Sequence, residues 1–195
     1  AASSKLLIFP QGRVAPLVFR RSDGKNLGPL KKSGGGSVVV VSLDARIIHG
    51  PGAEPREGAF KTTAAKANND GKTLEMVASH GRGNALVVVG GRSFMLTNNE
   101  LIASKLATRD PLWRVPCDLS LALIAAGETL VAGGVDRVGA FSTDSGQPLW
   151  SAPVEGKVFG LAVANGQLLV STDAGHIYAF RPGTTQLPNT TTDPA

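Results

Sequence analysis

An internal repeat with a period near 39 restricts this chain more than any other feature of its sequence. Residues 130–141 (LVAGGVDRVGAF) and 169–180 (LVSTDAGHIYAF) align at an offset of 39. Residues 111–116 (PLWRVP) and 148–153 (PLWSAP) align at an offset of 37, so the two copies differ by a short insertion or deletion. A chain with such a period stacks similar units, because one unit alone cannot bury its apolar face.

Weaker copies of the unit occur toward the N-terminus. Five phenylalanines taken as equivalent follow one another at spacings of 41, 34, 47 and 39 along the chain. They are Phe19, Phe60, Phe94, Phe141 and Phe180. The sequence therefore predicts four to five units, of which the last two are the best defined.

Each unit is predicted to consist of short strands. Four apolar runs bounded by Gly or Asn are typical of strands that are buried on both faces. These runs are residues 38–41, 85–89, 129–132 and 168–171. Asn165-Gly166 separates two apolar runs and is a strong hairpin signal. A repeat of this length built from short strands is typical of a propeller blade, so we expect an all-β fold that is a small, irregular or partial β-propeller.

Composition sets the expected boundaries of the propeller. The 24 glycines and 12 prolines favour turns over helices, and residues 99–108 are the only stretch that allows either a helix or a strand. Residues 184–195 combine Thr and Pro with no apolar periodicity, which predicts a linker or a disordered tail. We therefore expect the propeller repeats over residues 1–183.

Residues 140–150 (AFSTDSGQPLW) resemble the tryptophan-docking motif of the pyrroloquinoline-quinone-type β-propellers, which has the usual form A-x-D-x-x-T-G-K-x-x-W. Ala140, Gly146 and Trp150 match this motif, and three further positions carry Ser, Ser and Gln where the family has Asp, Thr and Lys. The resemblance is good over residues 107–183 and weaker before them. It implies blades of the quinoprotein-dehydrogenase-like type.

The motif also has a direct physical meaning. We expect Gly146 to adopt a positive φ at a corner between the edge strand of one blade and the next blade. Trp150 is then expected to bury its ring between adjacent blades, and Trp113 to do the same one blade earlier. Truncation of either buried ring to Ala costs ~3–5 kcal/mol. We therefore interpret Trp113, Trp150 and Gly146 as structural docking residues.

No catalytic constellation is visible. The single cysteine, Cys117, excludes an internal disulfide and a Cys-rich zinc site, and the three histidines lack the spacing of metal ligands. In the family's dehydrogenases, a quinone lies beside calcium and a catalytic Asp, often under adjacent cysteines. This chain has no Cys-Cys pair and about half of those blades. We assign no catalytic, cofactor-binding or metal residue, expect no cofactor, and lean toward a non-enzyme.

Positive charge is concentrated in the first third of the chain. Residues 1–66 carry a net charge of +7, and residues 67–195 carry a net charge of −2. Charged edge strands and turns explain this pattern; binding of an acidic polymer is the alternative, and no nucleic-acid-binding motif accompanies it. In residues 79–84 (SHGRGN), His80 and Arg82 could hold an anion or a partner. The simpler interpretation of this segment is an ordinary loop between strands.

These observations predict a non-enzymatic β-propeller scaffold that binds another protein or domain and is part of a larger multidomain chain. The alternatives are a fragment of a quinone- or metal-dependent oxidoreductase, or a module that binds an acidic polymer through its basic first third. No run of ~18 apolar residues is present to span a membrane. By resemblance, such propellers are bacterial and work in the periplasm or outside the cell. An open propeller would expose strand edges and favour a homodimer.

Overall fold

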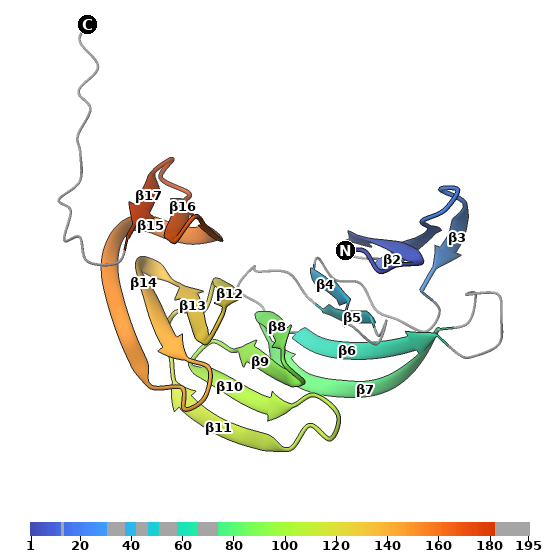
Figure 1. Cartoon of the computed structure of the whole chain (residues 1–195), viewed down its shortest axis with the longest axis horizontal. Coiled ribbons are helices and arrows are strands. Elements are labelled where there is room, and N and C mark those ends of the chain that lie inside the picture. Colours follow the sequence, from blue (N-terminus) through green and yellow to red (C-terminus); the bar gives the residue numbers. More distant parts are fainter. Residues whose placement is uncertain (13, 31–37, 42–46, 51–57, 66–73, 182–195) are drawn as a thin grey trace, which may run out of the picture.

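A computed structural model of the chain describes residues 1–12, 14–30, 38–41, 47–50, 58–65 and 74–181. Every regular element in these ranges is a β-strand, and all the strand pairs are antiparallel. Within the same ranges, no helix is long and apolar enough to cross a membrane. The strands form a series of small sheets that follow one another along an open arc (Figure 1). The predicted all-β fold is therefore confirmed.

Blades 1 and 2 form the N-terminal end of the arc. Blade 1 consists of β1 (Leu6–Gln11), β2 (Val14–Arg20) and β3 (Asn26–Pro29). Blade 2 consists of β4 (Val38–Val41), β5 (Ile47–Gly50), β6 (Gly58–Ala65) and β7 (Leu74–Gly83). In both blades, consecutive strands are hydrogen-bonded neighbours, which is the meander of a propeller blade.

Blades 3, 4 and 5 form the C-terminal part of the arc. Blade 3 consists of β8 (Ala85–Val89), β9 (Arg92–Leu96), β10 (Glu100–Lys105) and β11 (Pro111–Pro116). Blade 4 consists of β12 (Ala122–Ala126), β13 (Thr129–Gly133), β14 (Val135–Ser142) and the first part of β15 (Pro148–Ala164). Blade 5 consists of the second part of β15 with β16 (Gln167–Thr172) and β17 (Ile177–Phe180). The stretch at residues 99–108, which the sequence left open between a helix and a strand, thus contains strand β10.

Strand β15 belongs to two blades without an intervening loop. Its first part pairs with β14 as far as Lys157, and from Val158 it pairs with β16. Gly156 lies at the junction with φ +90°, and its N–H donates to Asp136 Oδ1 over 2.7 Å. The next N–H, that of Lys157, donates to Asp173 Oδ1, also over 2.7 Å. Two aspartates therefore satisfy the backbone groups that the change of partner leaves unpaired.

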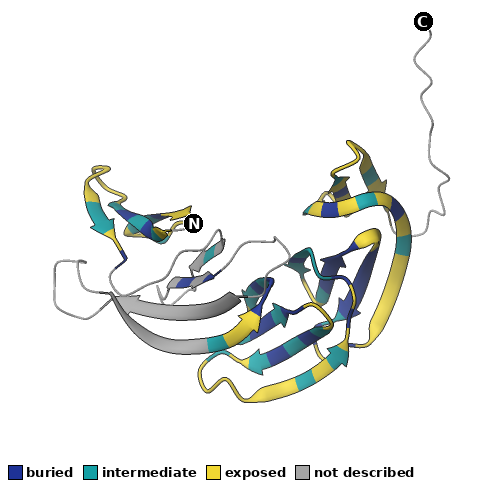
Figure 2. Cartoon of the chain, turned by 180° about the vertical axis from the view of Figure 1, so that it is seen from behind, coloured by how far each residue is buried: buried dark blue, intermediate teal, exposed yellow. Residues whose placement is uncertain are grey.

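The core lies between blades rather than within one sheet. Strands β4, β8 and β12 are the innermost strands of blades 2, 3 and 4, and β8 contacts both β4 and β12 (Figure 1). Buried side chains of blades 3 and 4 form one cluster that includes Phe94, Leu101 and Leu130. Blades 4 and 5 share a second cluster, built around Val138 and Val158. Figure 2 shows this buried interior and the exposed outer part of β15.

The ring is open in the described part of the chain. There β1 pairs with β2 and β17 pairs with β16, and no strand of blade 1 pairs with a strand of blade 5. Of the small, irregular and partial propellers that the sequence allowed, the described residues form a partial one, an open arc (Figure 1). Strand β16 also differs from the expectation of burial on both faces, since Leu169 is 37% exposed and no other blade in the described ranges covers it. The predicted linker at residues 184–195 lies outside the described residues.

Candidate functional site

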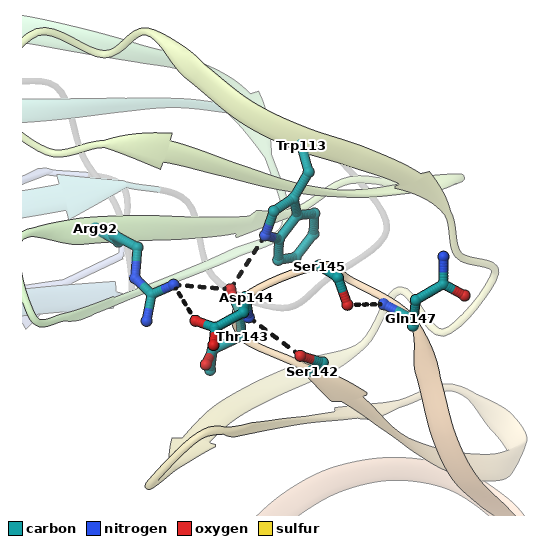
Figure 3. A network of polar contacts seen from close by, with 7 residues as sticks. All are labelled: Arg92, Trp113, Ser142, Thr143, Asp144, Ser145 and Gln147. Carbon is teal, nitrogen blue, oxygen red and sulfur yellow. Dashed lines mark hydrogen bonds and ion pairs between the residues drawn. The ribbon is translucent and has the colours of Figure 1, made fainter.

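Trp113 and Gly146 form a contact between blades 3 and 4. Trp113 lies on β11, and its indole N–H donates to the carbonyl oxygen of Thr143 over 3.1 Å (Figure 3). Gly146 has φ +71°, and a Cβ atom at this position would lie 2.7 Å from Cε3 of Trp113. The turn of one blade thus rests directly on the indole ring of the blade before it. Only glycine fits both the backbone conformation and the available space.

The position of this turn differs from the prediction in one respect. Gly146 was expected at a corner between two blades, whereas it lies between β14 and β15 within blade 4. Gly146 nevertheless contacts the indole ring of Trp113, which belongs to blade 3. The turn is closed within the blade by a hydrogen bond from the Gly146 N–H to the carbonyl oxygen of Ser142 over 2.9 Å.

Arg92 extends the contact from β9. Its Nη1 donates to the carbonyl oxygen of Thr143 over 3.1 Å and to Asp144 Oδ1 over 2.7 Å (Figure 3). The guanidinium carbon also lies 5.5 Å from the centroid of the Phe94 ring, a distance that permits a cation–π interaction. Sequence reasoning missed Arg92, because a single arginine after a Gly-Gly turn carries no signal of a partner in the turn of another blade.

Trp150 does not have the environment of Trp113. Its side chain is 39% exposed, which is more than the burial expected for a ring between blades. The ring contacts Phe180 of blade 5 edge to face, with centroids 5.0 Å apart. The physical reason for the difference is local: Trp113 is covered by the turn at Gly146, and no described turn covers Trp150 in the same way.

A cleft of about 470 Å³ lies between blades 2 and 3. His80 and Arg82 on β7 line one side of it, and residues of β9, β10 and β11 line the other. This segment was predicted to be a loop, but residues 80–83 belong to β7. The register of β6 and β7 skips His80, because Phe60 pairs with Gly81 and Lys61 pairs with Ser79. His80 is therefore the extra residue of a β-bulge.

The charges around this cleft are mainly positive. Arg82, Arg109 and Arg114 line it together with one carboxylate, Glu100. Arg114 Nη1 lies 3.6 Å from Glu100 Oε2. Burial lowers the pKa of His80, and the nearby Arg109 guanidinium lowers it further. The imidazole is therefore neutral at pH 7 and lies in a lining that holds more guanidinium groups than carboxylates.

The outward face of blade 5 is apolar and exposed. Leu169 pairs with Ala162 and Ala179, and Ile177 pairs with Ser171, so these side chains share the face that points away from blade 4. Ile177 is 78% exposed. The opposite face of the same sheet packs into the cluster shared with blade 4. Blade 5, the last blade of the described arc, thus exposes an apolar sheet face, whereas apolar side chains of blades 2 to 4 are packed between neighbouring blades.

No group of three or more His, Cys, Asp or Glu side chains that could hold a metal ion occurs in the described residues. Cys117 is buried between blades 3 and 4, and burial raises the pKa of its thiol. His176 Nε2 lies 3.4 Å from Glu155 Oε2 at the surface. The side chain of His49 lies outside the described residues.

Residues 98–186 match the family model described as outer membrane protein assembly factor BamB. The match spans blades 4 and 5 and the outer strands of blade 3. Together with the fold, it confirms the resemblance to pyrroloquinoline-quinone-type propeller repeats. A search of the curated proteins found no matching sequence.

Several solved structures share the fold. The computationally designed Ika8 protein is similar at a TM-score of 0.73 and 14% identity, over 93% of this chain and 57% of Ika8. The chain therefore spans little more than half the length of that structure. The computationally designed Ika4 protein is similar at a TM-score of 0.59 and 16% identity, over 78% of this chain and 94% of Ika4. BamB from Moraxella catarrhalis is similar at a TM-score of 0.57 and 13% identity, over 92% of this chain and 70% of BamB.

Proposed function

We propose that this chain is a non-enzymatic β-propeller module that acts as a rigid scaffold and binds another protein or domain. The observation that carries the proposal is the exposed apolar face of blade 5, which includes Leu169 and Ile177. In the rest of the arc, clusters of apolar side chains join each blade to the next. A sheet face with the same character that no blade covers among the described residues favours association with a further protein surface.

The comparisons support the same class of function. Residues 98–186 match a model whose description names an assembly factor of outer membrane proteins, and a propeller presents broad surfaces on a stable frame. We infer that the protein is bacterial, that it works in the periplasm or outside the cell, and that it belongs to a longer chain. An uncovered blade 5 also favours a homodimer, because the face of one copy can cover the face of another.

Sedimentation velocity tests the homodimer that the uncovered face of blade 5 favours, across roughly 1 to 100 μM, the concentration range of weak complexes. The sedimentation coefficient of the wild type should rise with concentration. Ile177→Lys places a charge on the face and should keep the protein monomeric. Val135→Lys is the matched control, because Val135 is 59% exposed and lies on β14 of blade 4. A wild type that stays monomeric and matches Ile177→Lys at every concentration would refute association through this face.

A second measurement separates the scaffold from the oxidoreductase alternative. The protein is mixed with pyrroloquinoline quinone and calcium, dialysed and scanned in visible light. The proposal expects the quinone to be removed by dialysis. A stoichiometric bound chromophore that oxidises an alcohol would contradict a non-enzymatic role.

A further inference from the structure

We propose that the cleft between blades 2 and 3 binds an acidic peptide segment of a partner protein. This inference rests on the proposed scaffold function and adds a ligand class to it. The cleft is separate from the face of blade 5: its lining residues come from β7 and from the outer strands of blade 3. Its volume of about 470 Å³ lies within the range of small-ligand sites, which is enough room for a few side chains of a peptide.

The first support is the way the backbone shapes the wall formed by β7. Gly81 has φ +92°, and the bulge that it closes adds His80 to the strand. Bulges of this kind redirect a side chain and are frequent beside binding sites. At Gly83 a Cβ atom would lie 2.7 Å from Cγ of Met95 and 2.8 Å from the carbonyl oxygen of Leu96. The glycines therefore bring β7 against β9, while His80 and Arg82 remain at the cleft.

The second support is the excess of guanidinium groups over carboxylates. Arg82 comes from β7, Arg109 from the turn between β10 and β11, and Arg114 from β11. The Arg109 backbone is held with φ +67°, and its N–H donates to the carbonyl oxygen of Lys105 over 2.7 Å. Among the described residues, the carboxylate of Glu100 is the only acidic group in the lining. Guanidinium groups bind carboxylates through paired, charge-assisted hydrogen bonds.

The third support is the mixed character of the remaining lining. Met95, Ile102 and Pro111 supply apolar surface beside the arginines, and Asn99 and Ser104 supply polar groups. An inorganic anion uses only the charges of such a cleft. A peptide with Glu or Asp next to an apolar residue uses both kinds of surface, which favours it over a free phosphate.

Fluorescence anisotropy with two labelled peptides tests the proposal. One peptide carries four glutamates around a leucine, and the other has glutamine in place of each glutamate. The wild type should bind the acidic peptide at least tenfold more tightly. The double variant Arg82→Gln/Arg109→Gln should weaken this binding by about tenfold or more, as expected for the loss of charge-assisted hydrogen bonds. Glu100→Gln should strengthen it, because it removes the opposing carboxylate.

The controls distinguish this cleft from other surfaces. Arg20→Gln/Lys25→Gln removes the same number of charges from blade 1 and should leave the affinity within about twofold, because unrelated surface charges act weakly. Ile177→Lys should also bind the peptide normally, since it disturbs only the proposed association face. Equal binding of both peptides, an equal loss in the blade 1 variant, or tighter binding of inorganic phosphate or a single-stranded oligonucleotide would overturn the proposal. If the wild type self-associates but does not bind the acidic peptide, the proposed peptide site in the cleft is refuted and the proposed scaffold function is not.

Discussion

Replacing Gly146 by alanine tests how blades 3 and 4 are held together. The new Cβ would lie 2.7 and 2.8 Å from Cε3 and Cζ3 of Trp113, and 3.0 Å from Cγ1 of Val115. The indole cannot move away easily, because its N–H donates to the carbonyl oxygen of Thr143. Its ring also packs against Phe94, with the ring centroids 5.9 Å apart. Such crowding costs about 1–3 kcal/mol. A left-handed backbone conformation costs an alanine about 1–2 kcal/mol more.

We therefore expect Gly146→Ala to lower the free energy of unfolding by about 2–5 kcal/mol. Gly127→Ala is the matched control in the same blade, since Gly127 has φ +59° and no atom within 4 Å of its added Cβ. Its free energy of unfolding should fall only by the cost of the left-handed backbone conformation, about 1–2 kcal/mol. Urea unfolding followed by far-ultraviolet circular dichroism measures both variants under identical conditions.

A double-mutant cycle locates the source of the extra loss. In a Trp113→Leu background the ring edge is absent, so the additional effect of Gly146→Ala should shrink toward that of Gly127→Ala. Equal losses for the two glycine variants in the wild-type background would refute the steric argument. Full retention of the Gly146→Ala effect in the Trp113→Leu background would show that the strain lies elsewhere.

Three further predictions follow from side-chain environments. Trp113→Ala should cost about 3–5 kcal/mol in urea unfolding and Trp150→Ala clearly less, because Trp150 is 39% exposed; equal losses would contradict this. In a histidine NMR titration, Arg109→Gln should raise the lowered pKa of His80, because it removes a positive neighbour. The stability that neutral His80 contributes is complete above pH ~6.5 and is lost as pH falls from there through its folded-state pKa. Since burial raises the pKa of Cys117, a thiol reagent should modify it only upon unfolding, and the stability from its protonated form should fall as pH rises past ~8.5.

The sequence predicted the repeat architecture well because the relevant signals are local. Residues 38–41 and 85–89 form strands with the predicted bounds. Asn165 and Gly166 both have positive φ in the hairpin between β15 and β16, as a tight hairpin turn requires and as these two residue types readily allow. In each case the neighbouring side chains and the turn chemistry decide the structure.

Features that depend on contacts between blades were harder to predict. Gly146 was recognised as a corner, but the ring beneath it belongs to Trp113, which lies on the last strand of the preceding blade. Trp150 repeats the sequence pattern of Trp113 and yet is partly exposed, because exposure depends on what the next blade supplies. The apparent loop around His80 forms a bulged strand, since pairing with β6 overrides the turn preference of two glycines.

Strand β15 has a consequence for how the arc responds to opening. Its 17 residues pair with β14 as far as Lys157, one residue past Gly156, and with β16 from Val158 onward. A tether of this kind has no loop that could act as a hinge, so blades 4 and 5 cannot swing apart without breaking a ladder. Amide protons on both sides of Gly156 should accordingly exchange with solvent in one cooperative event.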